Sequence, residues 1–115
     1  KTKINLCAMA NISSKASKDF DITGSLKDFS LSKRINKGDW LKVQHKFSQG
    51  SVNSFAHFSG DSNPIHTNED YARNNPHRTF RNSVVHGLLV AGLFSTLFGR
   101  TFEGSLYVSQ NLKFL

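Results

Sequence analysis

Apolar and polar side chains alternate over residues 41–47. Leu41, Val43, His45 and Phe47 share one face of this segment, and a lysine or glutamine occupies each position between them. A period of two predicts a strand with one buried and one solvated face. The same period returns over residues 105–115, where Leu106, Val108, Leu112 and Phe114 fall on one face, and predicts a second strand.

The longest apolar run covers residues 84–98 and is interrupted by one histidine, one serine and one threonine. Ser83 is suited to cap a helix over this run, and Gly99 to end it. Its 15 residues would span roughly 22 Å, whereas a membrane crossing needs about 20 residues. A helix that is apolar on every side must be buried on every side, which calls for a curved sheet around it. Two strands cannot enclose a helix, so we expect more strands after Leu115 or from a partner.

Two shorter helices are predicted between these segments. Ser51 is a suitable N-cap for the first, and Gly60 suits its C′ position. The second opens at Thr67, with Asp70 three residues later in a capping-box arrangement, and stops before the next proline. Residues 1–32 are rich in serine and lysine and are interpreted as a leader or flexible arm, which leaves one folded domain over residues 33–115.

The composition narrows the class of protein. A length of 115 residues allows one domain, and the single cysteine, Cys7, excludes an internal disulfide and a cysteine metal cluster. The net charge of +7 is spread along the chain: residues 1–40 carry eight Lys/Arg against four Asp/Glu, and residues 41–115 carry seven against four. Without a basic block, we expect neither nucleic-acid nor membrane binding, but some attraction for an anionic carrier.

Candidate chemistry gathers in residues 61–66, which read DSNPIH. On an unbroken helix Asp61 and His66 would point about 140° apart. Pro64 opposes such a helix, so the segment is predicted to be a tight connection in which the carboxylate and the imidazole face one space. An acid and a base that share one water are what a hydration reaction requires. The same residues are also ordinary turn formers, and that interpretation stays open.

Three segments together resemble one family. FSGDSNPIH, SVVHGLLVAGLFSTLFG and GSLYVSQNLKF are similar to the MaoC-like, or type-2 enoyl-thioester hydratase, family. The likeness runs from about Asn36 to Leu115, rests on the signature D-x-N-P-x-H, and is greatest to mitochondrial 3-hydroxyacyl-thioester dehydratases. It implies an α+β hot-dog fold, in which a bent antiparallel sheet wraps one long helix. Family members normally continue for several strands, so we expect the C-terminal strands to be missing from this chain.

The resemblance also implies an activity. Asp61 and His66 would hold the water that adds to a trans-2-enoyl thioester, giving the (R)-3-hydroxyacyl product reversibly, and Asn63 would steady the turn. The substrate would be carried by acyl carrier protein or coenzyme A, in mitochondrial fatty-acid synthesis, by a homodimer. No cofactor and no metal are expected.

Three positions of the long helix carry further expectations. The Gly87 N–H lies in the first turn, where backbone donors have no intrahelical partner, and could bind the thioester oxygen as it gains negative charge. Ser95 lies two turns later and could line the acyl pocket or bond Asp61, or it could bond back to its own helix. His86 is interpreted as a structural group with its hydrogen bonds satisfied. Gly92 is assumed to permit close packing.

Other functions remain alternatives. A hot-dog thioesterase would hydrolyse the same class of substrate, and a non-catalytic remnant or binding module could keep the motif as part of the fold. The D-x-N-P-x-H signature argues against the thioesterase, whereas the expected loss of strands gives some support to the non-catalytic alternative. Acyl chain length, the choice of carrier and the activity of this chain alone are not encoded in the pattern.

Overall fold

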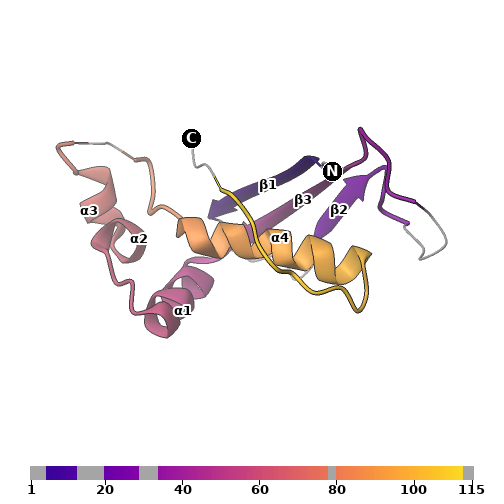
Figure 1. Ribbon diagram of the computed structural model, residues 1–115. Coiled ribbons are helices and arrows are strands. Elements are labelled where there is room, and N and C mark those ends of the chain that lie inside the picture. The colour runs from indigo at the N-terminus through magenta and orange to yellow at the C-terminus, as the bar shows by residue number, and fades with distance from the viewer. Residues whose placement is uncertain (1–4, 13–19, 29–33, 78–79, 113–115) are drawn as a thin grey trace.

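The computed structural model describes residues 5–12, 20–28, 34–77 and 80–112 of the chain. Three strands and four helices follow one another in this part: β1 (Asn5–Ile12), β2 (Asp21–Gly24), β3 (Trp40–Phe47), α1 (Gln49–Ser59), α2 (Pro64–Thr67), α3 (Glu69–Arg73) and α4 (Gly87–Thr101). Figure 1 shows α4 lying along the sheet, with α1, α2 and α3 grouped at one end of the molecule. The architecture is α+β, as predicted.

The strand predicted at residues 41–47 is confirmed as β3, the central strand of the described sheet. Its alternation works as expected, because Leu41, Val43 and Phe47 are buried and form part of the core. The strand order is β1-β3-β2; β1 runs parallel to β3, with Asn5 opposite Trp40, and β2 runs antiparallel to it. The described sheet is therefore mixed, and the prediction of a purely antiparallel sheet is wrong for these strands.

Both outer strands lie in residues 1–32, which the sequence analysis interprets as a leader or flexible arm. The structure differs there, since β1 and β2 each hydrogen-bond to β3. The physical reason is that a strand's stability comes from its neighbour across the sheet, and the polar composition of the segment does not reveal that neighbour. The division of the chain at residue 33 stays a prediction.

The short helices differ from the predicted ones mainly at their ends. α1 is capped by Ser48, whose side chain accepts from the Ser51 N–H, so the predicted cap is three residues too late. The second predicted helix is two pieces, α2 and α3, and Asn68 rather than Thr67 caps α3 by accepting from the Tyr71 N–H. In both cases a nearby polar side chain, Ser48 before the predicted cap and Asn68 after it, accepts from the free N–H groups of the first turn.

The long apolar helix is present as α4, but it starts and ends later than predicted. His86 is its N-cap residue, Ser83 caps nothing because its buried hydroxyl has no partner among the described residues, and the helix continues through Gly99. One side packs against β1 and β3 through residues that include Leu93 and Leu97. The remaining side is solvent-exposed.

The exposed stripe of α4 contradicts the expectation of burial on every side. Leu88 is 68% exposed, and Gly92, Ser95 and Gly99, which follow it at helical spacing, are exposed as well. A side chain on Gly92 would meet nothing within 4 Å, so this glycine does not serve the close packing assumed for it. A three-stranded sheet covers one side of a helix only, which explains the difference.

The strand predicted at residues 105–115 is absent over residues 105–112, and residues 113–115 lie outside the described part. Leu106 and Val108 are more than 80% exposed, and the segment runs back across α4 (Figure 1), where the Tyr107 ring lies 5.0 Å from that of Phe98. Alternation fixes which side chains share a face, but a strand also needs a hydrogen-bonding neighbour.

None of the helices in the described part of the chain combines the length and the apolar character that a membrane span requires.

Candidate functional site

The polar cluster predicted at residues 61–66 begins in the turn between α1 and α2. Gly60 ends α1 in the left-handed conformation (φ 79°), with its N–H donating to the Ala56 carbonyl at 2.9 Å. A glycine suits this position because other residues adopt that conformation at a cost. The chain leaves the helix axis there, which carries Asp61 out toward the start of α4.

Asp61 is fixed by bonds within the turn. Its N–H donates to the Ser59 hydroxyl at 3.2 Å, and its Oδ1 accepts from the Asn63 N–H at 3.3 Å. The Asn63 side chain accepts from the Ile65 N–H at 3.2 Å and so caps α2. Asn63 thus makes two local hydrogen bonds, and the role that the family resemblance implies for it stays a prediction. One carboxylate oxygen of Asp61 is held by the backbone, and Oδ2 is left to face the neighbouring side chains.

His66 lies in α2 and is held on two sides. Its Nδ1 lies 2.6 Å from the Val84 carbonyl, and its own carbonyl accepts from Gln49 Nε2 at 2.8 Å. Pro64 begins this short helix at its first position, where the missing N–H costs nothing. The prediction that Pro64 prevents a continuous helix over residues 61–66 is therefore correct only for residues 61–63, because Pro64 itself begins α2.

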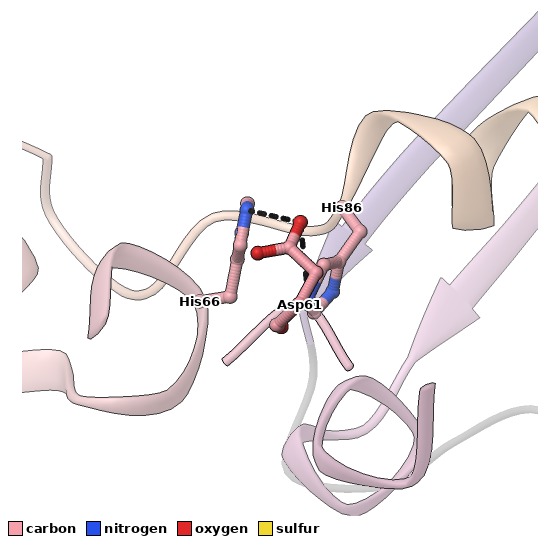
Figure 2. A group of neighbouring side chains, drawn as sticks. All are labelled: Asp61, His66 and His86. Atoms are coloured by element: carbon pink, nitrogen blue, oxygen red, sulfur yellow. Dashed lines mark hydrogen bonds and ion pairs between the residues drawn. The ribbon is translucent and has the colours of Figure 1, made fainter. Parts of the chain in front are cut away.

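Asp61 and His66 converge, and His86 joins them (Figure 2). Asp61 Oδ2 lies 4.0 Å from His66 Nε2 and 4.0 Å from His86 Nε2. The two imidazole rings stack, with centroids 3.8 Å apart. Both histidines are buried, whereas the Asp61 side chain is 53% exposed. The cluster therefore has a buried wall of two rings and a carboxylate that solvent or a substrate can reach.

The hydrogen bonds fix which ring nitrogens carry hydrogen. A carbonyl oxygen only accepts, so His66 Nδ1 must donate to Val84, which leaves a lone pair on Nε2 in the neutral ring. His86 Nε2 lies 2.9 Å from the Asp61 carbonyl and must donate to it. Hence His66 presents a proton acceptor to the Asp61 carboxylate, and His86 presents a donor to the Asp61 backbone. Only the first of the two can act as a base toward this space.

A metal ion is another use for such a cluster. Asp61, His66 and His86 each offer an atom within 4.8 Å of the others. The hydrogen-bond pattern does not suit it, because the His86 nitrogen near the carboxylate is a donor and only His66 Nε2 and Asp61 Oδ2 offer lone pairs. Catalytic zinc sites use three protein ligands. The arrangement fits acid–base chemistry better.

The other two predicted residues lie on α4. Gly87 is the first residue of the helix, directly after His86, and the first intrahelical bond is donated by the Val90 N–H to the His86 carbonyl at 3.1 Å. The Gly87 N–H therefore precedes the helical ladder, and the residue is half-buried and follows His86 directly in the chain. Ser95 lies on the exposed stripe, and no hydrogen bond joins it to Asp61 in the described part of the chain. Roles for Gly87 and Ser95 stay predictions.

His86 is the residue that sequence reasoning set aside. It is 1% exposed, and its Nδ1 has no partner among the described residues, so the interpretation as a satisfied structural group is wrong for that atom. The bond to Asp61 joins positions 25 residues apart, which no local pattern reveals. The available signal was a single imidazole at the start of an otherwise apolar helix.

Comparison with known proteins adds an independent finding. The chain is 37% identical over 82 residues to an (R)-specific enoyl-CoA hydratase of Rhodospirillum rubrum, covering 70% of this chain and 55% of the relative. It is 38% identical over 92 residues to a mitochondrial 3-hydroxyacyl-acyl-carrier-protein dehydratase of Arabidopsis thaliana (77% and 54%). An (R)-specific enoyl-CoA hydratase of Aeromonas caviae is 34% identical over 82 residues (70% and 59%).

The chain spans about half the length of these curated relatives. No solved structure matches it. Residues 30–115 match the family described as the MaoC like domain, and this stretch includes every residue of the cluster. A match over most of the chain, together with relatives more than 30% identical, establishes the family: this chain belongs to the MaoC-like domain proteins.

Proposed function

We propose that the protein adds water reversibly to trans-2-enoyl thioesters and forms (R)-3-hydroxyacyl thioesters. One observation carries the proposal. Asp61 Oδ2 lies 4.0 Å from His66 Nε2, the ring nitrogen with the lone pair, in the segment that carries the D-x-N-P-x-H signature. The names of the relatives support it, because they are hydratases and dehydratases of such thioesters.

The separation of the two groups suits a bound water. At 4.0 Å, Asp61 Oδ2 and His66 Nε2 are too far apart for a direct hydrogen bond. A single water that bonds both at about 2.8 Å can bridge atoms up to roughly 5.6 Å apart, so it fits between them. His66 Nε2 would accept one of its hydrogens and Asp61 Oδ2 the other. The lone pairs of the oxygen would then face the substrate.

Hydration needs one bond to oxygen and one bond to hydrogen. The water oxygen bonds to C3 of the enoyl group while a water proton passes to the Asp61–His66 pair. The electrons of the C2–C3 double bond move to C2 and into the thioester carbonyl. The Asp61–His66 pair then returns a proton to C2. Dehydration follows the same steps in reverse, so the two groups exchange the roles of acid and base.

Negative charge on the thioester oxygen has to be stabilised during these steps. The Gly87 N–H precedes the helical ladder of α4 and points from the positive end of the helix dipole. Gly87 follows His86 directly in the chain. A substrate whose C3 contacts the bound water can therefore place its thioester carbonyl near the Gly87 N–H. Preorganised donors of this kind contribute much of the rate enhancement of acyl-transfer and enolisation enzymes.

The biological setting is part of the proposal. The thioester carrier is acyl carrier protein or coenzyme A, since both occur in the names of the relatives. We place the activity in mitochondrial fatty-acid synthesis, because the Arabidopsis thaliana relative is a mitochondrial dehydratase. We also propose a homodimer, because β1 and β2 are the outer strands of the described sheet and open edges favour pairing.

The test is an absorbance assay of enoyl-thioester hydration with the whole protein and two variants. Asp61→Asn keeps an oxygen for the Asn63 N–H, and His66→Asn keeps a donor for the Val84 carbonyl but removes Nε2. Each should lower kcat per folded molecule by about 10²–10⁴, the usual contribution of a positioned acid or base, with little change in melting temperature for Asp61→Asn. Asp70→Asn and His57→Asn are matched controls on exposed helix positions.

Three outcomes would contradict the proposal. Near-full hydratase activity of Asp61→Asn would remove the acid–base role of the pair. Release of free thiol, without loss of the enoyl double bond, would indicate a thioesterase instead. A protein that binds the thioester but neither hydrates nor hydrolyses it would favour the non-catalytic alternative.

A further inference from the structure

His86 occupies a position where a purely structural residue would be apolar. It is 1% exposed and lies between two other aromatic rings: His66 stacks on it at 3.8 Å, and the Phe55 ring meets it at 5.0 Å and an interplanar angle of 60°. Its Nδ1 is buried and without a partner among the described residues. Such an atom is rare in native proteins and calls for an explanation. Packing alone would be served better by a phenyl ring.

The other ring nitrogen explains the histidine. His86 Nε2–H donates to the Asp61 carbonyl at 2.9 Å. The remaining described bonds of Asp61 reach residues only two positions away, namely Ser59 and Asn63. Local bonds of this kind fix the shape of a turn but not its position relative to the rest of the fold. The bond to His86 is the long-range link of Asp61 in the described part of the chain.

We propose that His86 is a positioning residue, which holds the Asp61 turn against the start of α4. This inference rests on the proposed function. The side chain of His86 fixes the Asp61 backbone, its ring supports that of His66, and its peptide continues into Gly87. One residue therefore sets the distance between the water-binding pair and the proposed oxyanion donor. His86 acts through Asp61 and does not itself touch the substrate.

Two substitutions separate the functions of the ring. His86→Phe keeps an aromatic ring between His66 and Phe55 but has no donor for the Asp61 carbonyl. His86→Gln loses the ring but can place an amide N–H close to the position of Nε2. We expect His86→Phe to lower kcat by about 10–100-fold with KM nearly unchanged, because a misplacement of about 1 Å costs up to 10² in rate. His86→Gln should recover most of that loss.

The purely structural alternative predicts a different pattern. If His86 only fills space, His86→Phe should stay active and His86→Gln should lose melting temperature and folded fraction together. Kinetics and thermal unfolding are therefore measured on the same preparations of the whole protein. Equal kcat values for wild type and His86→Phe, per folded molecule, would overturn the proposal.

A double-mutant cycle tests the route of the effect. If His86 acts through Asp61, His86→Phe should cost little in the Asp61→Asn background, because the group it positions no longer functions. Fully additive losses would show that His86 acts elsewhere and would count against the proposal.

A readout without activity keeps this inference separate from the proposed function. Long-range ¹H–¹⁵N spectra of the ring nitrogens should show the hydrogen of neutral His86 on Nε2 and that of neutral His66 on Nδ1. An active hydratase with the His86 hydrogen on Nδ1 would overturn the inference alone. An inactive protein with the expected tautomers would overturn the proposed function and the catalytic role of His86. The hydrogen bond from His86 to the Asp61 carbonyl would still be confirmed.

Discussion

Replacing Gly87 by alanine distinguishes an oxyanion donor from a packing requirement. Gly87 is the first residue of α4, and it is not among the described glycines with positive φ, so its backbone conformation does not require glycine. The absence of a side chain must then serve either the packing of the helix start or the approach of a substrate. The two explanations predict opposite results.

The magnitudes follow from the position in the helix. Alanine is favoured over glycine by about 1 kcal/mol in a helix interior, and at the first position only part of that gain applies. If there is room, Gly87→Ala should therefore leave the free energy of unfolding unchanged or raise it slightly. A methyl group beside the proposed donor should keep the thioester carbonyl away from the N–H. The loss of one such donor costs about 10²–10³ in kcat, or roughly 2.7–4 kcal/mol of transition-state stabilisation.

Gly92→Ala is the matched control. Gly92 lies on the exposed stripe of the same helix, and an added Cβ would meet nothing within 4 Å. We expect it to gain up to about 1 kcal/mol in stability and to keep full activity. Urea unfolding and enoyl-thioester hydration are measured on both variants. A destabilised Gly87→Ala protein that keeps wild-type kcat per folded molecule would refute the oxyanion argument and decide for packing.

Two further predictions concern the support of the site and the assembly. Gln49→Leu removes the hydrogen bond to the His66 carbonyl. We expect the free energy of unfolding in urea to fall by about 0.5–1.5 kcal/mol, and kcat to fall less than in Asp61→Asn. An unchanged kcat would show that the bond to Val84 alone holds His66 in place. Light scattering of the whole protein should give the mass of a dimer, and a monodisperse monomer would contradict the proposed pairing of sheet edges.

Local patterns predicted the parts of the fold that local forces decide. The alternation over residues 41–47 identified β3 because burial of Leu41 and Val43 on one face is a property of the strand itself. Gly60 was recognised as a helix end because its left-handed conformation favours glycine. The convergence of Asp61 and His66 followed from the chain's departure from a helix at the turn, although Pro64 begins a new helix there.

Contacts distant in sequence were not predictable in the same way. The partners of β3 lie in a polar segment, where nothing in the residues shows that they would pair. Residues 105–112 carry the alternation of a strand, yet they have no neighbouring strand in the described part of the chain. The start of α4 was placed too early because Val84 and Val85 are apolar, whereas Val84 lies before the helix and hydrogen-bonds to Ile65 and His66.

The site depends on the core as well as on its own residues. Asp61 and His66 belong to one turn, but His86 and Gly87 reach them only because α4 packs on the sheet through Leu93 and Leu97. The Val84 carbonyl, which sets the tautomer of His66, belongs to the segment that leads into that helix. A shift of α4 along the sheet would therefore move a tautomer-setting acceptor, a backbone anchor and a proposed oxyanion donor together. The geometry of the site therefore depends on the packing of α4 as much as on the residues of the turn.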